Sequence, residues 1–473
     1  MAVLAIDQGT SGTKAIVVDE SGSVLAVAEE SVRPEYREGG VVEQDPAELL
    51  ASVLTAGRRA CAEAGVTPRV VSLANQGETV LAWNPHTGEP LTVALVWQDS
   101  RAESVCSDLR DHAHDIAQRT GLVLDPYFSA PKMAWLRRHL TREGVVTTTD
   151  SWLLHHLTGE IVTDVTTASR SLLLDIDSLT WDANLVSLFG LRDEQMPRLI
   201  ACDEAIGSTS VFGGNATVAG AIVDQQAALL AEACLQPGQA RCTYGTGAFI
   251  LANSGSRAVR STAQLTTSVA WTLRDVTAYC VDGQVYTAAS ALRWLVDLGI
   301  LSSADQVDVT AMPSSDGVMF VPGLAGLAAP WWHSSACGAI TGMSLSTTAG
   351  HIVRAVIDGV AAQVAELAMV MGDDVGTPLT SLRVDGGMTA SRALLQAQAD
   401  LLQIPVEVYP SPHATALGAA ALGRLAVDST LTISDAVGGW TPLSIVEPQW
   451  SSDRAAEYLG RWREAVRLAR GLS

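Results

Sequence analysis

Residues 3–18 read VLAIDQGTSGTKAIVV, two apolar runs joined by a polar turn that contains two glycines. Apolar runs on either side of such a turn predict a β-hairpin, and the apolar residues 24–28 after a further turn predict a third strand. Turns rich in Gly, Ser and Thr let backbone N–H groups and hydroxyls approach phosphate oxygens closely. The hairpin therefore has two interpretations, an ordinary antiparallel connection or a phosphate-binding loop.

A second strand–turn–strand is predicted at residues 239–253, with Tyr244-Gly245-Thr246-Gly247 at its turn. Repetition of one pattern in both halves of a chain indicates duplicated domains. The length of 473 residues also exceeds what one hydrophobic core usually serves. We therefore predict two domains, residues 1–235 and residues 236–473, each with a turn that can hold a phosphate group.

The second half also shows an alternating order of helices and strands. Apolar positions at steps of three and four predict a long helix at residues 351–371. A strand at 382–384, a turn at 385–387, a helix at 391–403 and a strand at 406–408 follow it. Because doubly wound sheets bind nucleotides at the carboxyl ends of such strands, the sequence predicts an α/β fold with a nucleotide site at the 385–387 turn.

The composition narrows the classes of partner. A net charge of −21, with lysine only at positions 14 and 132, argues against nucleic-acid binding, because nucleic-acid binders carry a basic patch. The seven cysteines form no C-x-x-C pair, which favours free thiols in a reducing compartment. The N-terminus lacks the basic region of a signal peptide, and no apolar run approaches the roughly 18 residues of a membrane span. We expect a soluble, cytoplasmic protein.

The sequence lacks the common nucleotide-binding motifs. No Gly-Lys dipeptide occurs, which excludes a Walker A loop, and no G-x-G-x-x-G follows a predicted strand. A nucleotide would then use the two hairpin turns. Asp7, at the end of the first strand, can hold Mg²⁺ because hard cations prefer carboxylate oxygens, and Lys14 can place positive charge near a transferring phosphoryl group.

Asp224 follows an apolar strand and begins an Ala/Leu-rich helix in residues 221–229, AIVDQQAAL. An aspartate at this position can act as the general base for a substrate hydroxyl. Aspartate is also among the best helix N-cap residues, so position alone leaves a structural interpretation open.

Ten strings resemble, in their order along the chain, those of the FGGY family of carbohydrate kinases, and most closely its glycerol kinase branch. They are DQGTSGTKAIVVD, VVEQDP, ANQGET, VWQDSR, DPYFSAPKMAWL, TDVTTASRSLL, DQQAALL, TYGTG, LRVDGG and ATALGAAALG. The resemblance implies two ATPase domains of the actin and Hsp70 type, ribonuclease H-like, with a cleft between them. Residues 1–235 would hold the substrate and the first phosphate loop, and residues 236–473 the nucleotide. The implied activity is the phosphorylation of a small polyol or sugar by ATP with Mg²⁺, in a homodimer or other homo-oligomer.

The resemblance also implies roles for individual residues. Asp224 matches the catalytic base and, with Asp7, a ligand of the metal ion. Five further residues match the substrate pocket: Gly77, Glu78, Tyr127, Gln225 and Phe249. Nine match ATP-binding positions: Thr10, Ser11, Gly12, Lys14, Thr246, Ala289, Arg293, Gly387 and Ser391.

Some of these positions depart from the glycerol kinase pattern. Gly77 stands where that branch has an arginine, so the chain lacks a cationic donor, and we expect extra space and a longer or differently shaped acceptor. The other interpretation is that Gly77 is a neutral change in an enzyme that accepts glycerol. Ala289, Arg293 and Ser391 replace glycine, glutamine and asparagine, which can alter the adenine contacts.

Two rival functions stay open at this point. One is an FGGY kinase for another sugar, a ketopentose or a sugar acid. The other is an actin-like nucleotide-binding regulator without turnover, although such a protein has no need of the polyol residues at positions 78, 127 and 225.

Overall fold

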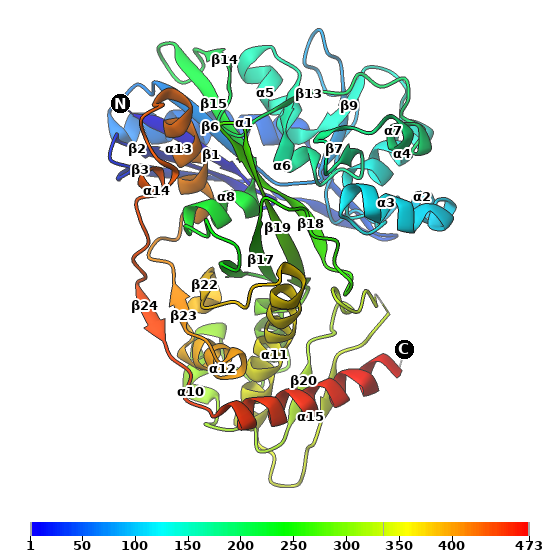
Figure 1. Ribbon diagram of the computed structural model, residues 1–473, viewed down its shortest axis with the longest axis vertical. Helices are drawn as coiled ribbons and strands as arrows, with labels where there is room; N and C mark the ends of the chain where they lie inside the picture. The colour runs from blue at the N-terminus through cyan, green and yellow to red at the C-terminus, as the bar shows by residue number, and fades with distance from the viewer. Residues whose placement is uncertain (1, 334, 472–473) are drawn as a thin grey trace.

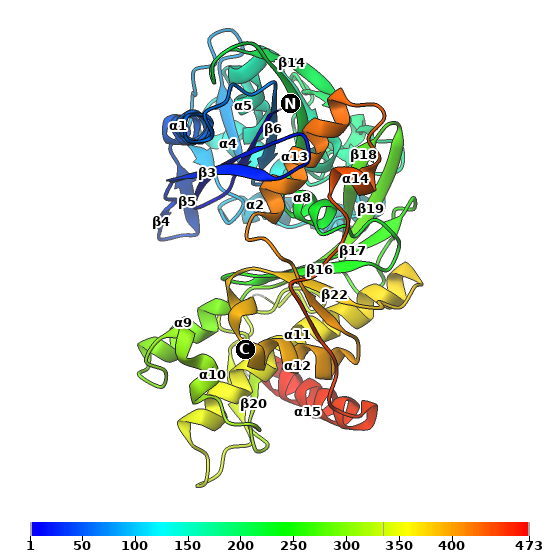
Figure 2. The ribbon, with the colours of Figure 1, turned by 90° about the vertical axis from the view of Figure 1, so that its left-hand side faces the viewer.

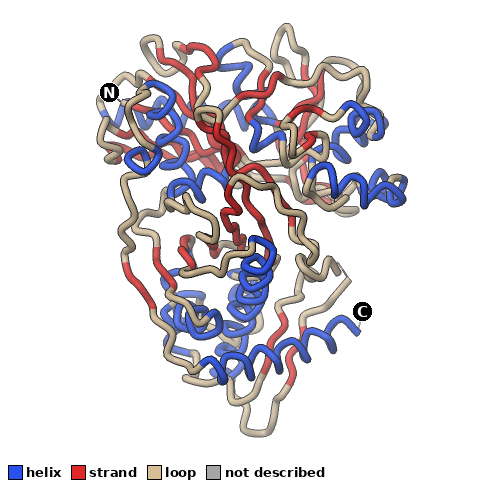
Figure 3. The backbone as a smooth tube through the Cα atoms, viewed as in Figure 1, coloured by secondary structure: helices blue, strands red, loops and turns tan. Residues whose placement is uncertain are grey.

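The computed structural model describes residues 2–333 and 335–471. Figure 1 shows two lobes, each built around one sheet, with the C-terminal helix α15 (Ser452–Gly471) along the base of the second lobe. Figure 3 shows strands from the second sheet extending upward between the lobes.

The first sheet contains the predicted hairpin. Its order is β14-β15-β6-β1-β2-β3. β1 pairs antiparallel with β2 and parallel with β6, and β6 pairs parallel with β15. The bounds are β1 Val3–Gln8, β2 Gly12–Val18, β3 Val24–Ser31, β6 Val70–Asn75, β14 Ala205–Thr209 and β15 Ala216–Val223. The prediction of three opening strands is therefore confirmed.

The second sheet repeats this topology. Its order is β18-β19-β17-β16-β22-β23-β24. β16 pairs antiparallel with β17 and parallel with β22, and β22 pairs parallel with β23. These three pairings correspond to β1 with β2, β1 with β6 and β6 with β15 in the first sheet. The bounds are β16 Ala240–Tyr244, β17 Ala248–Gly255, β18 Thr266–Leu273, β19 Val276–Val285, β22 Leu382–Asp385, β23 Val406–Val408 and β24 Ser444–Val446. The similarity of the two hairpins in the sequence thus extends to two whole sheets.

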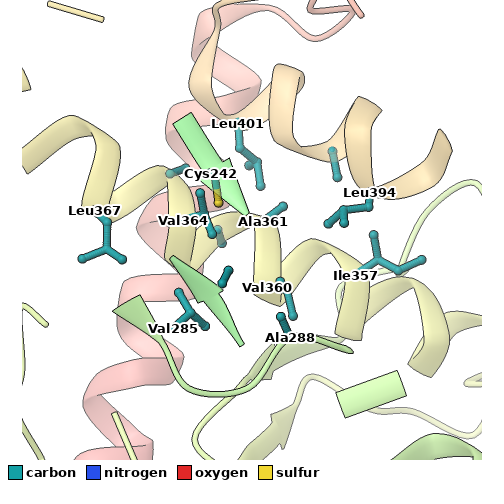
Figure 4. Close-up of a cluster of buried hydrophobic side chains, with 14 of the residues drawn as sticks. Cys242, Val285, Ala288, Ile357, Val360, Ala361, Val364, Leu367, Leu394 and Leu401 are labelled. Atoms are coloured by element: carbon teal, nitrogen blue, oxygen red, sulfur yellow. The ribbon is translucent and has the colours of Figure 1, made fainter. Parts of the chain in front are cut away.

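Helices cover both sheets. α1 (Pro46–Ala64) packs on β2 and β3, and its N-cap is Asp45, whose carboxylate accepts the Ala47 N–H. α11 (Ala349–Val375) fills the second core between β17, β19 and α12 (Arg392–Leu402); Figure 4 shows its Val360, Val364 and Leu367 among buried side chains. Among the described residues α11 alone has the length and hydropathy to cross a bilayer, but 78% of that window is buried inside the protein.

One helix crosses from its own half of the chain to the other. α13 (Ala414–Val427) packs against β1, β6, β15 and α8 (Asp224–Ala231), all from the first half. Figure 2 shows it in the upper lobe beside α8, far from its sequence neighbour α12. The first sheet is therefore covered by a helix that lies beyond residue 236.

A third, five-stranded sheet with the order β4-β5-β8-β7-β9 extends the first lobe. Its bounds are β4 Glu35–Arg37, β5 Val41–Gln44, β7 Val80–Trp83, β8 Ala94–Leu95 and β9 Val145–Thr148, and the helices after these strands include α2 Glu103–Asp108, α3 Ala113–Thr120, α4 Ser129–His139 and α5 Thr149–Thr158. The other elements are β10 Val162–Asp164, α6 Val165–Ala168, β11 Leu174–Asp175, β12 Thr180–Trp181, α7 Ala183–Leu188, β13 Arg198–Ile200, α9 Ala289–Asp297, α10 Val307–Thr310, β20 Met319–Val321, β21 Ala339–Thr341 and α14 Ile433–Ala436, with short 3₁₀ turns at Arg110–His112, Ala304–Gln306 and Gly387–Ala390.

Candidate functional site

A cavity of about 820 Å³ has walls from both halves of the chain. The parallel strands β1, β6 and β15 end at one edge of the first sheet, where Gln8, Asn75 and Val223 share the same register. The chain that follows each strand therefore enters the cavity. Nine of the predicted site residues line it: Thr10, Ser11, Gly77, Glu78, Tyr127, Asp224, Gln225, Thr246 and Phe249.

Asp224 is the first residue of α8, not its cap. The N-cap position belongs to Val223, which makes no side-chain cap hydrogen bond, and the Asp224 carboxylate accepts the N–H of Gln225 at 2.6 Å. The N-cap interpretation is therefore wrong in its geometry. Burial, together with the negative charges of Asp7 and Glu78, raises the pKa of Asp224 to about 7. A carboxyl with such a pKa can exchange protons at neutral pH.

Asp7 is the second carboxyl at this edge. The pKa of Asp7 is raised to about 6, because the effect of burial outweighs the opposing charge of its cross-strand neighbour Lys14. Because the charge of Asp7 disfavours ionisation of Asp224, a divalent cation between them would stabilise both charged forms. The two residues thus fit a Mg²⁺ site in donor chemistry and charge. No group of three or more His, Cys, Asp or Glu residues suited to a metal occurs within 2–333 and 335–471.

The first hairpin turn is held in place by the side chains of Trp97 and Gln44. Trp97 Nε1 donates to Thr10 Oγ1 at 2.8 Å, and Gln44 Nε2 donates to the Thr10 carbonyl oxygen at 2.7 Å. Gly12 begins β2, where a Cβ would lie 2.6 Å from the Glu30 carbonyl oxygen. Lys14 Nζ lies 3.2 Å from a Glu29 carboxylate oxygen, and Lys14 is not part of the cavity wall.

Arg170 is a cavity residue that motif analysis left without a role. Its Nε donates to Glu78 Oε1 at 2.6 Å, and its Nη1 donates to Asp282 Oδ2 at 2.6 Å and to Ser268 Oγ at 2.9 Å. Its guanidinium carbon lies 5.7 Å from the centre of the Tyr127 ring. Arg170 and Asp282 both line the cavity. The string TDVTTASRSLL contains Arg170, but no sequence signal relates it to the distant Glu78.

Lys132 holds the segment that carries Tyr127. It is fully buried, and its ammonium group donates to the carbonyl oxygens of Pro126 and Phe128, each at 2.8 Å, and to that of Tyr127. Burial lowers the pKa of Lys132 to about 8. The backbone of residues 126–128 is therefore fixed by one buried cation.

Val223 packs beside Gly77, where the expected arginine side chain would begin. A Cβ built on Gly77 would lie 2.9 Å from Val223 Cγ2, and both residues line the cavity. Contacts this short do not occur between real side chains without movement of one partner. Val223 therefore limits the position of a side chain at residue 77, and the expectation of extra space for a longer acceptor stays a prediction.

The remaining nucleotide positions lie outside the wall of this cavity. Ala289 begins α9 and donates its N–H to the Gly245 carbonyl oxygen at 3.1 Å, while Arg293 is exposed. Gly387 is exposed, and a Cβ added there would meet no heavy atom within 4 Å. Ser391 caps α12, and its hydroxyl donates to Asp308 Oδ1 at 2.5 Å. The Ser391 hydroxyl is thus already engaged within the protein.

Comparison with known proteins identifies relatives over the whole chain. The N-terminal domain model of the FGGY family of carbohydrate kinases matches residues 2–231, and the C-terminal domain model matches residues 240–427. A glycerol kinase of Aromatoleum aromaticum is 40% identical over 99% of both chains, and one of Thermus brockianus is 40% identical over 99% of this chain and 98% of its own.

Solved structures give the same result. The crystal structure of Plasmodium falciparum glycerol kinase with ADP superposes with a TM-score of 0.93 at 30% identity, covering 99% of this chain and 98% of that one. A ligand-bound xylulose kinase from Lactobacillus acidophilus superposes with a TM-score of 0.91 at 20% identity, covering 100% of this chain and 98% of that one, which shows a shared fold.

Proposed function

This chain belongs to the FGGY family of carbohydrate kinases, and we propose that it transfers the γ-phosphoryl group of ATP to a terminal hydroxyl of a small polyol with Asp224 as the general base. It is a glycerol kinase-like, ATP-dependent kinase with the two-domain actin/Hsp70-like fold. The observation that carries the proposal is the position of Asp224 in a cavity that both halves line, with its pKa raised to about 7.

We propose that the acceptor binds mainly to residues 1–235, with Phe249 of the second half beside it. Glu78, Tyr127 and Gln225 offer hydrogen bonds to the acceptor hydroxyls, and Phe249 forms an apolar side. Asp224 would accept the hydroxyl proton as the oxygen forms a bond to the γ-phosphorus and the bond to ADP breaks. Most of the rate would come from positioning and from exclusion of water, which competes as an acceptor.

The nucleotide half comes from residues 236–473 and from the first hairpin turn. Thr10, Ser11 and Thr246 would hold the phosphates, while Ala289, Arg293, Gly387 and Ser391 remain proposed adenosine positions outside the cavity wall. Asp7 and Asp224 would hold Mg²⁺, which when bound neutralises charge on the phosphate oxygens.

The Gly77–Val223 contact bears on the identity of the acceptor. Val223 lies beside Gly77, and the pocket has no cation at residue 77. Arg170 is the guanidinium that remains in the cavity, and it already contacts Glu78. We propose that Arg170 and Glu78 together bind an acceptor hydroxyl, and that a carbon atom of the acceptor packs against Val223.

An ADP-release assay with Mg-ATP tests the proposed function. The acceptors are glycerol, erythritol, the threitols, the pentitols and common ketoses, each at several concentrations. We expect turnover with a small polyol, at least about a hundredfold above hydrolysis without acceptor. ATP hydrolysis that no acceptor stimulates would instead support the actin-like regulator, and a preference for a ketopentose would support the other sugar kinase.

The cellular setting is a further part of the proposal. We propose a soluble cytoplasmic enzyme that forms a homodimer or other homo-oligomer and binds neither membranes nor nucleic acid. The net charge of −21 supports the last point, and the seven cysteines, all unpaired, suit a reducing compartment. Light scattering coupled to gel filtration measures the oligomeric state.

A further inference from the structure

A buried cluster of charged side chains lies where α8 meets the second sheet. Arg241, on β16, has only 1% of its side chain exposed. Its Nε lies 3.0 Å from Glu232 Oε1, at the end of α8, and its Nη2 lies 3.2 Å from Asp385 Oδ1, at the end of β22. Figures 1 and 2 show α8 at the junction of the two lobes, next to these strands.

Arg241 also fixes an acceptor-site residue. Its Nη1 donates to the backbone carbonyl oxygen of Gln225 at 3.0 Å and to the side-chain Oε1 of Gln225 at 3.2 Å. Gln225 lines the cavity. Because the guanidinium engages the amide oxygen, the amide nitrogen is left to donate elsewhere. Gln225 is thereby oriented as a hydrogen-bond donor for a hydroxyl oxygen in the cavity.

At its other end Arg241 fixes the turn after β22. Asp385 also accepts a hydrogen bond from Thr243 Oγ1 at 2.5 Å. The next residue, Gly386, has φ +94°, and a Cβ there would lie 2.5 Å from the Tyr244 carbonyl oxygen. The turn before Gly387 is therefore closely packed against β16. Arg241 and Thr243 fix the position of this turn through their contacts with the Asp385 carboxylate.

We infer that Arg241 is a positioning residue that couples acceptor binding at Gln225 to nucleotide binding at the 385–387 turn. This inference rests on the proposed function, which places acceptor and nucleotide at these two sites. A buried guanidinium that loses one of its partners is left with an uncompensated charge, so a shift of the turn and a shift of Gln225 are energetically linked. Such coupling is reciprocal, because each ligand changes the affinity of the other by the same factor.

Arg241→Lys tests the inference with the charge kept. A lysine ammonium is a point charge without the planar fork that reaches three groups at once. We expect the acceptor KM to rise about tenfold or more, as for loss of a buried hydrogen bond to a charged group. The dissociation constant of ADP would be measured with and without saturating acceptor. We expect the wild-type chain to bind ADP several-fold more tightly with acceptor present, and the variant to lose most of that difference.

Arg383→Lys is the matched control. Arg383 is also buried on the second sheet, lies 3.6 Å from Glu407 Oε2 and donates to the Glu232 carbonyl oxygen. Within the described residues, its side-chain hydrogen bonds and ion pair join it to neither Gln225 nor Asp385. We expect this variant to keep the acceptor effect on ADP affinity. An equal loss in both variants, or no loss in Arg241→Lys, overturns the inference.

Two further variants secure the test if Arg241→Lys does not fold. Gln225→Met removes one end of the connection and Asp385→Asn weakens the other, so each should reduce the acceptor effect on ADP affinity. An unchanged effect in both overturns the inference. A wild-type chain that turns over no acceptor contradicts the proposed function together with this inference. Normal turnover with unchanged coupling in the variants contradicts the inference alone.

Discussion

At the scale of single residues, Asp224 is the position on which the proposed chemistry depends. Asp224→Asn keeps the shape of the side chain but cannot accept the hydroxyl proton. We expect kcat to fall by about 10²- to 10⁴-fold, the usual contribution of a general base, with the ADP dissociation constant within about threefold of wild type. Near-normal turnover in this variant would remove Asp224 from the role of base.

The contact between Gly77 and Val223 gives a second prediction at this scale. Gly77→Arg alone should lower acceptor turnover, because its Cβ would meet Val223 Cγ2 at 2.9 Å and overpacking costs about 1–3 kcal/mol. Gly77→Arg with Val223→Gly should recover the loss and raise kcat/KM for glycerol relative to longer polyols. The ratio of kcat/KM for glycerol to kcat/KM for a longer polyol, measured for the two single variants and the double variant, checks this. Additive effects would show that the two residues do not share the same space.

Lys132 gives a prediction about pH. Its pKa is lowered to about 8 in the folded protein from 10.5, so above pH 8 the folded chain releases this proton while the unfolded chain still binds it. Stability therefore rises with pH between 8 and 10.5. Between pH 8 and 10, wild type should gain about 2 kcal/mol of unfolding free energy relative to Lys132→Met. Urea titrations of both chains at three pH values measure this difference in unfolding free energy. An equal dependence of stability on pH in both chains would refute the prediction.

At the scale of elements, the contact between α13 and α8 positions the base. A Cβ on Gly418 would lie 2.0 Å from the carbonyl oxygen of Ala227, one turn after Asp224. Gly418→Ala should therefore lower stability by about 1–3 kcal/mol and reduce kcat as α8 moves. Gly460→Ala is the control, since Gly460 lies on an exposed face of α15 with open space around it. That variant should gain up to about 1 kcal/mol from helix propensity. Thermal melts and kcat for both variants decide the matter.

Elements with strong local signals were predictable from the sequence. Asp45 and the Pro46 that follows it mark the start of α1, and the predicted strand at 406–408 matches β23. Asp224 and Glu78 were predicted as site residues through family strings, and both line the cavity. Arg170 and Arg241 were missed because their roles arise from partners about 90 to 145 residues away, such as Glu78 and Asp385. A long-range ion pair leaves no periodicity or turn signal in a single sequence. The packing of Val223 against Gly77 was missed for the same reason.

At the scale of the whole molecule, the position of α13 predicts how the chain can be divided. Residues 1–235 alone would expose the apolar face of β1, β6 and β15 that α13 covers, and exposed apolar faces of this kind favour aggregation. We expect this fragment to be insoluble. The same fragment with residues 414–440 joined to its end by a flexible linker should be soluble. Expression of both fragments, compared by gel filtration, checks this. A monomeric, folded 1–235 fragment would show that α13 is dispensable to the first sheet.

The crossing of α13 also has a consequence for the order of events during synthesis. The last strand of the first sheet ends at Val223, and the helix that covers it begins at Ala414. At about 5–20 residues per second, the ribosome needs roughly 10–40 s to make the chain between them. Throughout that interval the nascent first sheet has an uncovered apolar face. A newly made chain would thus complete its N-terminal lobe late, and chaperones that bind exposed apolar surface have that interval in which to act on it.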